Sequence, residues 1–329
     1  MPMPAPAHPP DIAGVAALVR AAARSEIVPR ARNPAARLKA DGTWVTDADL
    51  AMQRRLQREL AALWPHIPLL GEEMTVEEQQ RLMSEEAASP NGPGLWVLDP
   101  LDGTSNFAAG LPCFGPSLAW VQGARVRLGV VVDVMRDETF SATEGRGAQL
   151  NGHALPAPST PIPLAKTIAC VDFKRLPAAL AARLATHPPY SSQRSIGSVA
   201  LDWCWVAAGR FHLYLHGSQG LWDYAAGSLI LSEAGRRGGV QQLPGQALCA
   251  VRGRCCAVRA MGGMDNAGKS LNPLRRWACN ASGFQARPVR RSGCPRSMRG
   301  KPSNLADIRQ HPGPAPRLRA LTWRVSGPQ

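Results

Sequence analysis

A short stretch of this 329-residue chain places two carboxylates beside a potential anion-binding turn. Asp99 and Asp102 follow an apolar run, and Gly103 allows the backbone to approach a ligand closely. Thr104 and Ser105 then begin a predicted short helix, whose first N–H groups are free to bind an anion. Because carboxylates and an anion repel each other, the pattern indicates a divalent cation between the two acids and a phosphate group.

Two further acidic sites occur where predicted elements begin or end. Glu72 and Glu73 follow a short apolar strand predicted at 69–70, and Asp223 stands at the start of a predicted helix. Taken singly, each acid is explained as well by a turn or a helix cap. Taken together, the acids beside one Gly-Thr turn favour a shared site for a hard cation, Mg²⁺ or Mn²⁺, because carboxylate oxygens suit such ions better than zinc.

Three segments of the sequence resemble the signature motifs of the inositol monophosphatase family. They are Gly71-Glu72-Glu73, the run at 96–107 that contains the DPLDGTSNF motif, and the WDYAAG run at 222–227. Their order and spacing agree with that family over about residues 11–235. The resemblance implies a Mg²⁺-dependent, Li⁺-sensitive phosphomonoesterase of the α+β class. It also implies the layered αβαβα sugar-phosphatase fold, in which an antiparallel sheet with helices is followed by a smaller α/β domain.

The resemblance assigns metal ligands residue by residue. Glu72, Asp99 and the carbonyl oxygen of Leu101 would hold one Mg²⁺ ion. Asp99, Asp102 and Asp223 would hold a second ion, and Glu72 would assist a third. Such ions cancel the charge of a phosphate dianion and lower the pKa of a bound water, so that no covalent enzyme intermediate is required.

Catalytic and substrate-binding roles follow from the same resemblance. Asp49 pairs with Thr104 to orient the attacking water, and Glu72 joins them as a catalytic residue. The expected substrate contacts are Gly103, Thr104, Ser105, Gly197, Ser198 and His216. His216 counts against inositol specificity, because inositol-specific members carry an acidic residue near that position. Lys39 matches a basic position beside the site in some members, and a solvated surface lysine explains it equally well.

The elements that must position these residues can be predicted from hydrophobic periodicity. Apolar spacing and end signals predict helices at 11–24, 46–64, 76–88, 178–185, 199–208 and 223–234. Apolar runs separated by turn residues predict an antiparallel meander at 116–121, 126–134, 138–142 and 148–150. We therefore expect a disordered lead at 1–10, an N-terminal α+β domain at 11–157 with most metal ligands, and a C-terminal α/β domain at 158–260. A proline-rich connection at 154–163 joins the two expected domains.

The charge is divided unevenly along the chain. Residues 1–235 carry a formal charge of −2 and residues 236–329 carry +16, which together make the net charge of +14. After Gly235 the usual family ending is not recognisable, and a disruption of the reading frame is one hypothesis for the change. We expect residues 261–329 to be a basic tail, rich in Arg, Pro and Cys, that is disordered or aberrant.

Other functions remain open at this stage. A 3′(2′),5′-bisphosphate nucleotidase and a fructose-1,6-bisphosphatase share the metal-binding acids and differ in the pocket. A protein that binds nucleic acid non-specifically through the basic tail belongs to a different class. No apolar run is long enough to span a bilayer and the N-terminus lacks a secretory pattern, so we expect a cytoplasmic protein without membrane contact. Its expected partners are a small phosphorylated substrate and a second copy in a homodimer.

Overall fold

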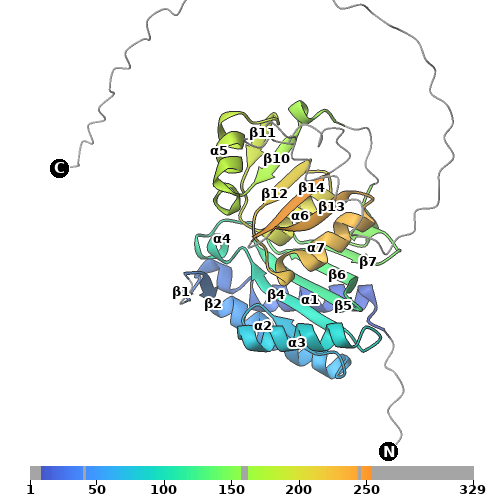
Figure 1. Ribbon diagram of the computed structural model, residues 1–329. Coiled ribbons are helices and arrows are strands. Elements are labelled where there is room, and N and C mark those ends of the chain that lie inside the picture. Colours follow the sequence, from blue (N-terminus) through green and yellow to red (C-terminus); the bar gives the residue numbers. More distant parts are fainter. Residues whose placement is uncertain (1–8, 40–41, 157–161, 244–245, 253–329) are drawn as a thin grey trace, which may run out of the picture. The chain divides into compact units, whose positions relative to one another are not determined.

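The computed structural model describes residues 9–39, 42–156, 162–243 and 246–252 (Figure 1). The predicted tail at 261–329, residues 1–8 of the predicted lead and residues 157–161 of the predicted connection lie outside these ranges. Within the described ranges, no helix has both the length and the apolar character needed to cross a bilayer.

A seven-stranded sheet occupies the first half of the chain. Its strand order is β3-β4-β5-β6-β7-β8-β9. The strands are β3 (Leu69–Gly71), β4 (Leu95–Asp102), β5 (Gly115–Gln122), β6 (Arg125–Asp133), β7 (Glu138–Thr143), β8 (Ala148–Leu150) and β9 (His153–Ala154). Strand β3 is parallel to β4 and each later pair is antiparallel, which confirms the predicted meander.

Helices cover both faces of this sheet. Successive side chains of a strand point to opposite faces, so neighbouring residues of β4 pack against different helices. On β4, Trp96 and Leu98 belong to a core that includes residues of α1 (Ile12–Glu26) and α2 (Asp47–Leu63). Their neighbours Leu95 and Val97 belong to a second core with α6 (Val199–Ala207) and α7 (Leu221–Glu233). The continuously apolar sequence of this strand is therefore explained by burial on both sides. Helix α3 (Val76–Ala88) follows β3 and packs near its edge of the sheet.

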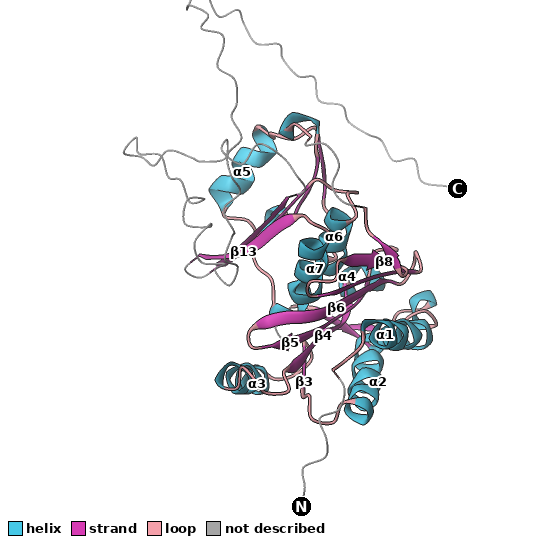
Figure 2. Cartoon of the chain, turned by 90° about the vertical axis from the view of Figure 1, so that its right-hand side faces the viewer, coloured by secondary structure: helices cyan, strands magenta, loops and turns pink. Residues whose placement is uncertain are grey.

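A five-stranded sheet lies on the other side of α6 and α7 (Figure 2). Its strand order is β11-β10-β12-β14-β13. The strands are β10 (Ile168–Val171), β11 (Ser192–Arg194), β12 (Leu213–His216), β13 (Arg237–Leu243) and β14 (Gln246–Arg252). On β10, Cys170 packs toward α6, whereas Ala169 and Val171 belong to a third core with α5 (Ala178–Thr186). Helices, sheet, helices, sheet and helix thus alternate, as in the expected layered αβαβα fold.

Several features of the fold were not predicted. A small antiparallel pair, β1 (Ala36–Leu38) with β2 (Trp44–Thr46), precedes α2. Strand β11 pairs in parallel with the edge of the second sheet. Beyond Gly235, where no family ending is recognisable in the sequence, β13 and β14 form a hairpin, and β14 pairs with β12. The division into domains at 157 and 260, with an atypical end after residue 235, stays a prediction.

Candidate active site

The end of β4 turns sharply at the predicted acidic motif. Asp99 pairs with Ser117 of β5 and Asp102 pairs with Gly115, so the register shifts between the two acids. Such a bulge re-aims side chains that would otherwise alternate between faces. Asp99 accepts a hydrogen bond from the Leu101 N–H at 2.9 Å. Both acids are buried.

Gly103 makes the turn into α4 (Thr104–Ala108) possible. Its φ is +85°, and a Cβ built there would lie 2.8 Å from the carbonyl oxygen of Cys113. Only glycine fits such a position without strain. Asn106, which the site prediction omitted, donates from Nδ2 to Cys113 O at 2.8 Å and to Ile196 O at 2.9 Å. The turn is thereby fastened to the loop that carries Gly197 and Ser198.

Asp49 reaches the same turn from the first turn of α2. It occupies position N3 of a capping box in which Thr46 is the N-cap. Oδ2 of Asp49 accepts from the Thr46 N–H at 2.8 Å, and its Oδ1 lies 3.3 Å from the Thr104 hydroxyl. Burial raises the pKa of Asp49 to about 6. The Thr104 hydroxyl also lies 2.9 Å from Leu101 O. Because a hydroxyl group has only one proton, a hydrogen bond donated to Asp49 leaves Leu101 O without this donor.

Glu72 follows β3, which runs parallel to β4. Its N–H donates to Leu98 O at 3.1 Å. Burial raises the pKa of Glu72 to about 7, against the opposing effect of Lys39. Lys39 Nζ lies 3.5 Å from Glu72 Oε1 and 2.6 Å from Glu73 Oε1. Of the two interpretations of Lys39, the structure therefore favours the one that places it beside the acids.

Asp102 and Asp223 connect this end of the first sheet to the α6–α7 layer. Asp102 accepts from the Ser198 hydroxyl and from the Ala200 N–H, the latter at 2.8 Å. Asp223 caps α7 by accepting from the Gly220 N–H at 2.7 Å. Burial, followed by the charge of Asp102, raises the pKa of Asp223 to about 8.

The acids lie within electrostatic reach of one another. Burial raises the pKa of Asp99 well above its usual range, and the charges of Glu72, Asp102 and Asp223 raise it further. Among the described residues, neither Asp99, Asp102 nor Asp223 has a Lys or Arg partner at ion-pair distance. In that same part of the chain, no three His, Cys, Asp or Glu side chains already stand in metal-ligating geometry. Buried carboxylates without cationic partners are a donor set that suits a hard divalent cation.

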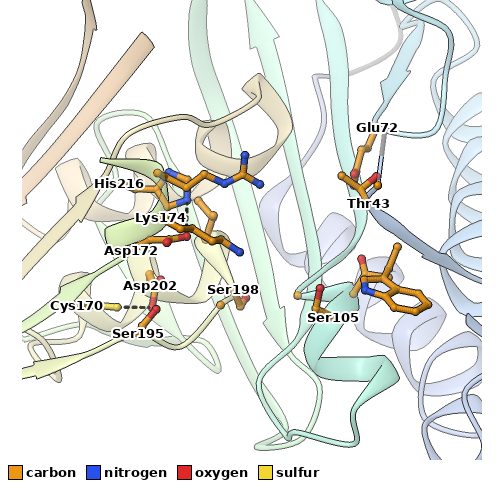
Figure 3. Close-up of a pocket in the computed structure, with 17 residues that line it drawn as sticks. Thr43, Glu72, Ser105, Cys170, Asp172, Lys174, Ser195, Ser198, Asp202 and His216 are labelled. Carbon is orange, nitrogen blue, oxygen red and sulfur yellow. Dashed lines mark hydrogen bonds and ion pairs between the residues drawn. The ribbon is translucent and has the colours of Figure 1, made fainter. Parts of the chain in front are cut away.

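A cavity of about 410 Å³ opens beside these acids (Figure 3). Glu72, Gly103, Thr104, Ser105, Gly197, Ser198 and His216 are the predicted site residues that line it. The other predicted residues are not part of its lining. Asp49, Asp99, Leu101 and Asp102 are buried, and Asp223 is half-buried. Glu72 and Thr43 lie on one side of the cavity, across from Asp172, Lys174 and His216.

The side of the cavity opposite Glu72 holds residues that the sequence prediction missed. Asp172, Lys174 and Arg175 come from the turn after β10, which continues into a short 3₁₀ helix (Phe173–Arg175). Asp202 lies deeper, and its Oδ1 accepts from the Cys170 thiol at 3.1 Å. Burial raises the pKa of Asp202 well above its usual range.

Comparison with known proteins agrees with this geometry. A family model described as the inositol monophosphatase family matches residues 11–273. An inositol-1-monophosphatase of Mycobacterium bovis is 36% identical over 210 residues, which are 59% of this chain and 67% of that protein. The Nus factor SuhB of Pasteurella multocida is 34% identical over 203 residues, which are 60% of this chain and 72% of that protein.

The fold also matches solved structures. The Thermotoga maritima IMPase superposes with a TM-score of 0.62 at 27% identity, covering 73% of this chain and 91% of that one. The family match extends past residue 235, where the sequence resemblance had stopped. Motifs, layered fold and family match thus agree, and the chain belongs to the inositol monophosphatase family of phosphomonoesterases.

Proposed function

We propose that this protein hydrolyses the phosphate monoester of a small sugar or cyclitol, such as inositol monophosphate, with Mg²⁺ as its cofactor. The observation that carries the proposal is the cluster of buried and half-buried acids beside the Gly103–Thr104 turn, at the edge of a cavity large enough for such a substrate. The proposed ligands are Glu72, Asp99, Asp102, Asp223 and the carbonyl oxygen of Leu101.

The charge balance of the site supports a cation. The charges of Glu72, Asp102 and Asp223 raise the pKa of Asp99, and those of Asp102 and Glu72 raise the pKa of Asp223, so the cluster is unfavourable while several members are ionised. When bound, Mg²⁺ would neutralise the phosphate dianion and lower the pKa of a bound water, and the number of ions is left open. Carboxylate and carbonyl oxygens are the ligands that this ion prefers.

The residues of the chain itself orient the reactants. Thr104 donates its hydroxyl proton to Asp49 Oδ1, and its oxygen is then free to accept a hydrogen bond from the attacking water. Because burial raises the pKa of Asp49 to about 6, most of this carboxyl is still ionised at neutral pH. The backbone N–H groups of Gly103 and Thr104, with Ser105, would bind phosphate oxygens as charge develops on them.

The test is phosphate release from a panel of esters with Mg²⁺, with and without Li⁺. Inositol 1-phosphate, adenosine 3′,5′-bisphosphate and fructose 1,6-bisphosphate separate the proposed function from its two closest alternatives. Asp99→Asn should abolish release while the thermal midpoint of unfolding stays within a few degrees. Asp137→Asn, the same change at an exposed ion pair with Arg20, is the matched control and should leave release unchanged. Equal activity of Asp99→Asn and wild type would contradict the metal assignment.

We also propose that the protein is cytoplasmic and forms a homodimer. Light scattering of the purified protein would test the homodimer. The alternative of nucleic-acid binding concerns the basic residues beyond 260, which lie outside the described residues. Salt-sensitive RNA binding by the full chain that is lost on truncation after Ala260 would support that alternative.

A further inference from the structure

Two neighbouring strand ends place an acid and an imidazole in the cavity wall. Strands β10 and β12 are parallel, with Val171 opposite Leu215, so Asp172 and His216 occupy the next positions. The Asp172 N–H donates to Leu215 O at 3.1 Å. His216 Nε2 lies 3.3 Å from Asp172 Oδ2, and both side chains line the cavity (Figure 3).

Both ring nitrogens of His216 are engaged by the protein. The Ser218 N–H donates to Nδ1 at 3.2 Å. Because a backbone N–H can only donate, Nδ1 carries no proton here, and the ring proton is on Nε2, facing Asp172. His216 is 5% exposed, and neither nitrogen is left over for a substrate. The imidazole therefore orients Asp172 rather than contacting a ligand through its own nitrogens.

Asp172 keeps one carboxylate oxygen available. Oδ2 faces His216, whereas Oδ1 has no hydrogen bond to any described residue. Burial opposes ionisation of this carboxyl, but the hydrogen bond from His216 and the positive charges of Lys174 and Arg175 outweigh it and lower the pKa of Asp172. A carboxylate in this state accepts hydrogen bonds and donates none.

We propose that Asp172 determines specificity by accepting hydrogen bonds from substrate hydroxyl groups, with His216 as its positioning residue. This inference rests on the proposed phosphatase function and names the substrate class as polyhydroxylated phosphate esters. Asp172 offers this acceptor from the end of β10, in the wall of the cavity.

The surrounding charge excludes a competing class of substrate. A carboxylate could also bind a substrate ammonium group. Lys174 and Arg175 line the same wall and have no ion pair with any described residue, so they would repel a second cation beside Asp172. Neutral hydroxyl groups suffer no such repulsion, which is why Asp172 is assigned to hydroxyl recognition.

The test compares two esters in the full-length protein with Mg²⁺. One is inositol 1-phosphate, and the other is p-nitrophenyl phosphate, which has no hydroxyl group. In Asp172→Asn the amide oxygen still accepts from His216, but an NH₂ donor replaces the free acceptor oxygen. We expect KM for inositol 1-phosphate to rise about tenfold or more, while kcat/KM for p-nitrophenyl phosphate stays within about twofold. Asp137→Asn is the matched control and should change neither.

His216 is tested by a pair of variants. His216→Phe removes the donor to Asp172 and should lose the preference for inositol 1-phosphate, whereas His216→Gln retains an N–H donor and should recover part of it. Equal losses on both esters in Asp172→Asn, or equal ester ratios in the two His216 variants, would overturn the inference. If wild type hydrolyses both esters and Asp172→Asn keeps the wild-type ratio, this inference alone fails. If wild type hydrolyses neither ester, the proposed function fails and the inference with it.

Discussion

Replacing Gly103 by alanine tests how the phosphate-binding turn is built. A non-glycine residue at φ +85° costs about 1–2 kcal/mol of unfolding free energy. The new Cβ would also lie 2.8 Å from the Cys113 carbonyl oxygen, a backbone atom that cannot rotate away. Overpacking of this kind adds about 1–3 kcal/mol, so the expected total loss is about 2–5 kcal/mol. Relief of the contact would also displace the N–H groups that follow Gly103.

Gly110→Ala is the matched control for that variant. Gly110 has φ +72° and no atom within 4 Å of a built Cβ, so alanine there meets the backbone cost of about 1–2 kcal/mol alone. Urea unfolding measures both losses, and phosphate release measures kcat/KM. We expect Gly103→Ala to lower kcat/KM more than about tenfold, as loss of an oxyanion donor does, and Gly110→Ala to keep it within about twofold. Equal losses of stability and equal activity in the two variants would refute the reasoning.

Two further predictions follow from the contacts of single side chains. Thr104→Val, which keeps the shape but removes the hydroxyl that faces Asp49, should lower kcat at least about tenfold with little change in KM, whereas Thr104→Ser should retain most of kcat in the same assay. Hydrogen bonds from Arg20 and, secondarily, from Arg24 lower the pKa of Asp137. The ionised carboxylate therefore stabilises the fold fully above the unfolded pKa of 3.8, and this stabilisation is lost as the pH falls through the lower pKa of the folded state. Between pH 5 and pH 2, the thermal midpoint of wild type should therefore fall further than that of Asp137→Asn, and parallel curves would contradict the assignment.

Helices and long strands could be predicted because their periodicity is local. The helix predicted at 76–88 has the observed bounds, since Thr75 and Glu78 form a capping box at its start. The pair β1–β2 was missed because β1 is three exposed residues long and has no buried face to leave a pattern. Strand β4 runs on past Asp99 to Asp102, because neighbouring elements bury polar residues that in sequence look like a turn.

The residues of the candidate site also fall into those that the sequence predicts and those that only the structure brings together. Asp99, Asp102 and Gly103 lie close together in the sequence, so their motif can be recognised without the structure. Asp172 and His216 are brought together by parallel pairing of β10 with β12, and nothing in the sequence around either residue indicates the other. The engagement of both His216 nitrogens depends on the Ser218 N–H, which any residue but proline would provide.

Calorimetric titration of Mg²⁺ into the full-length protein tests the central claim most directly, namely that acids far apart in the sequence form one cation site. The account predicts saturable binding to wild type and to Asp137→Asn, and loss of that binding in Asp99→Asn and Asp223→Asn alike. Undiminished Mg²⁺ binding by either of the last two variants would contradict it.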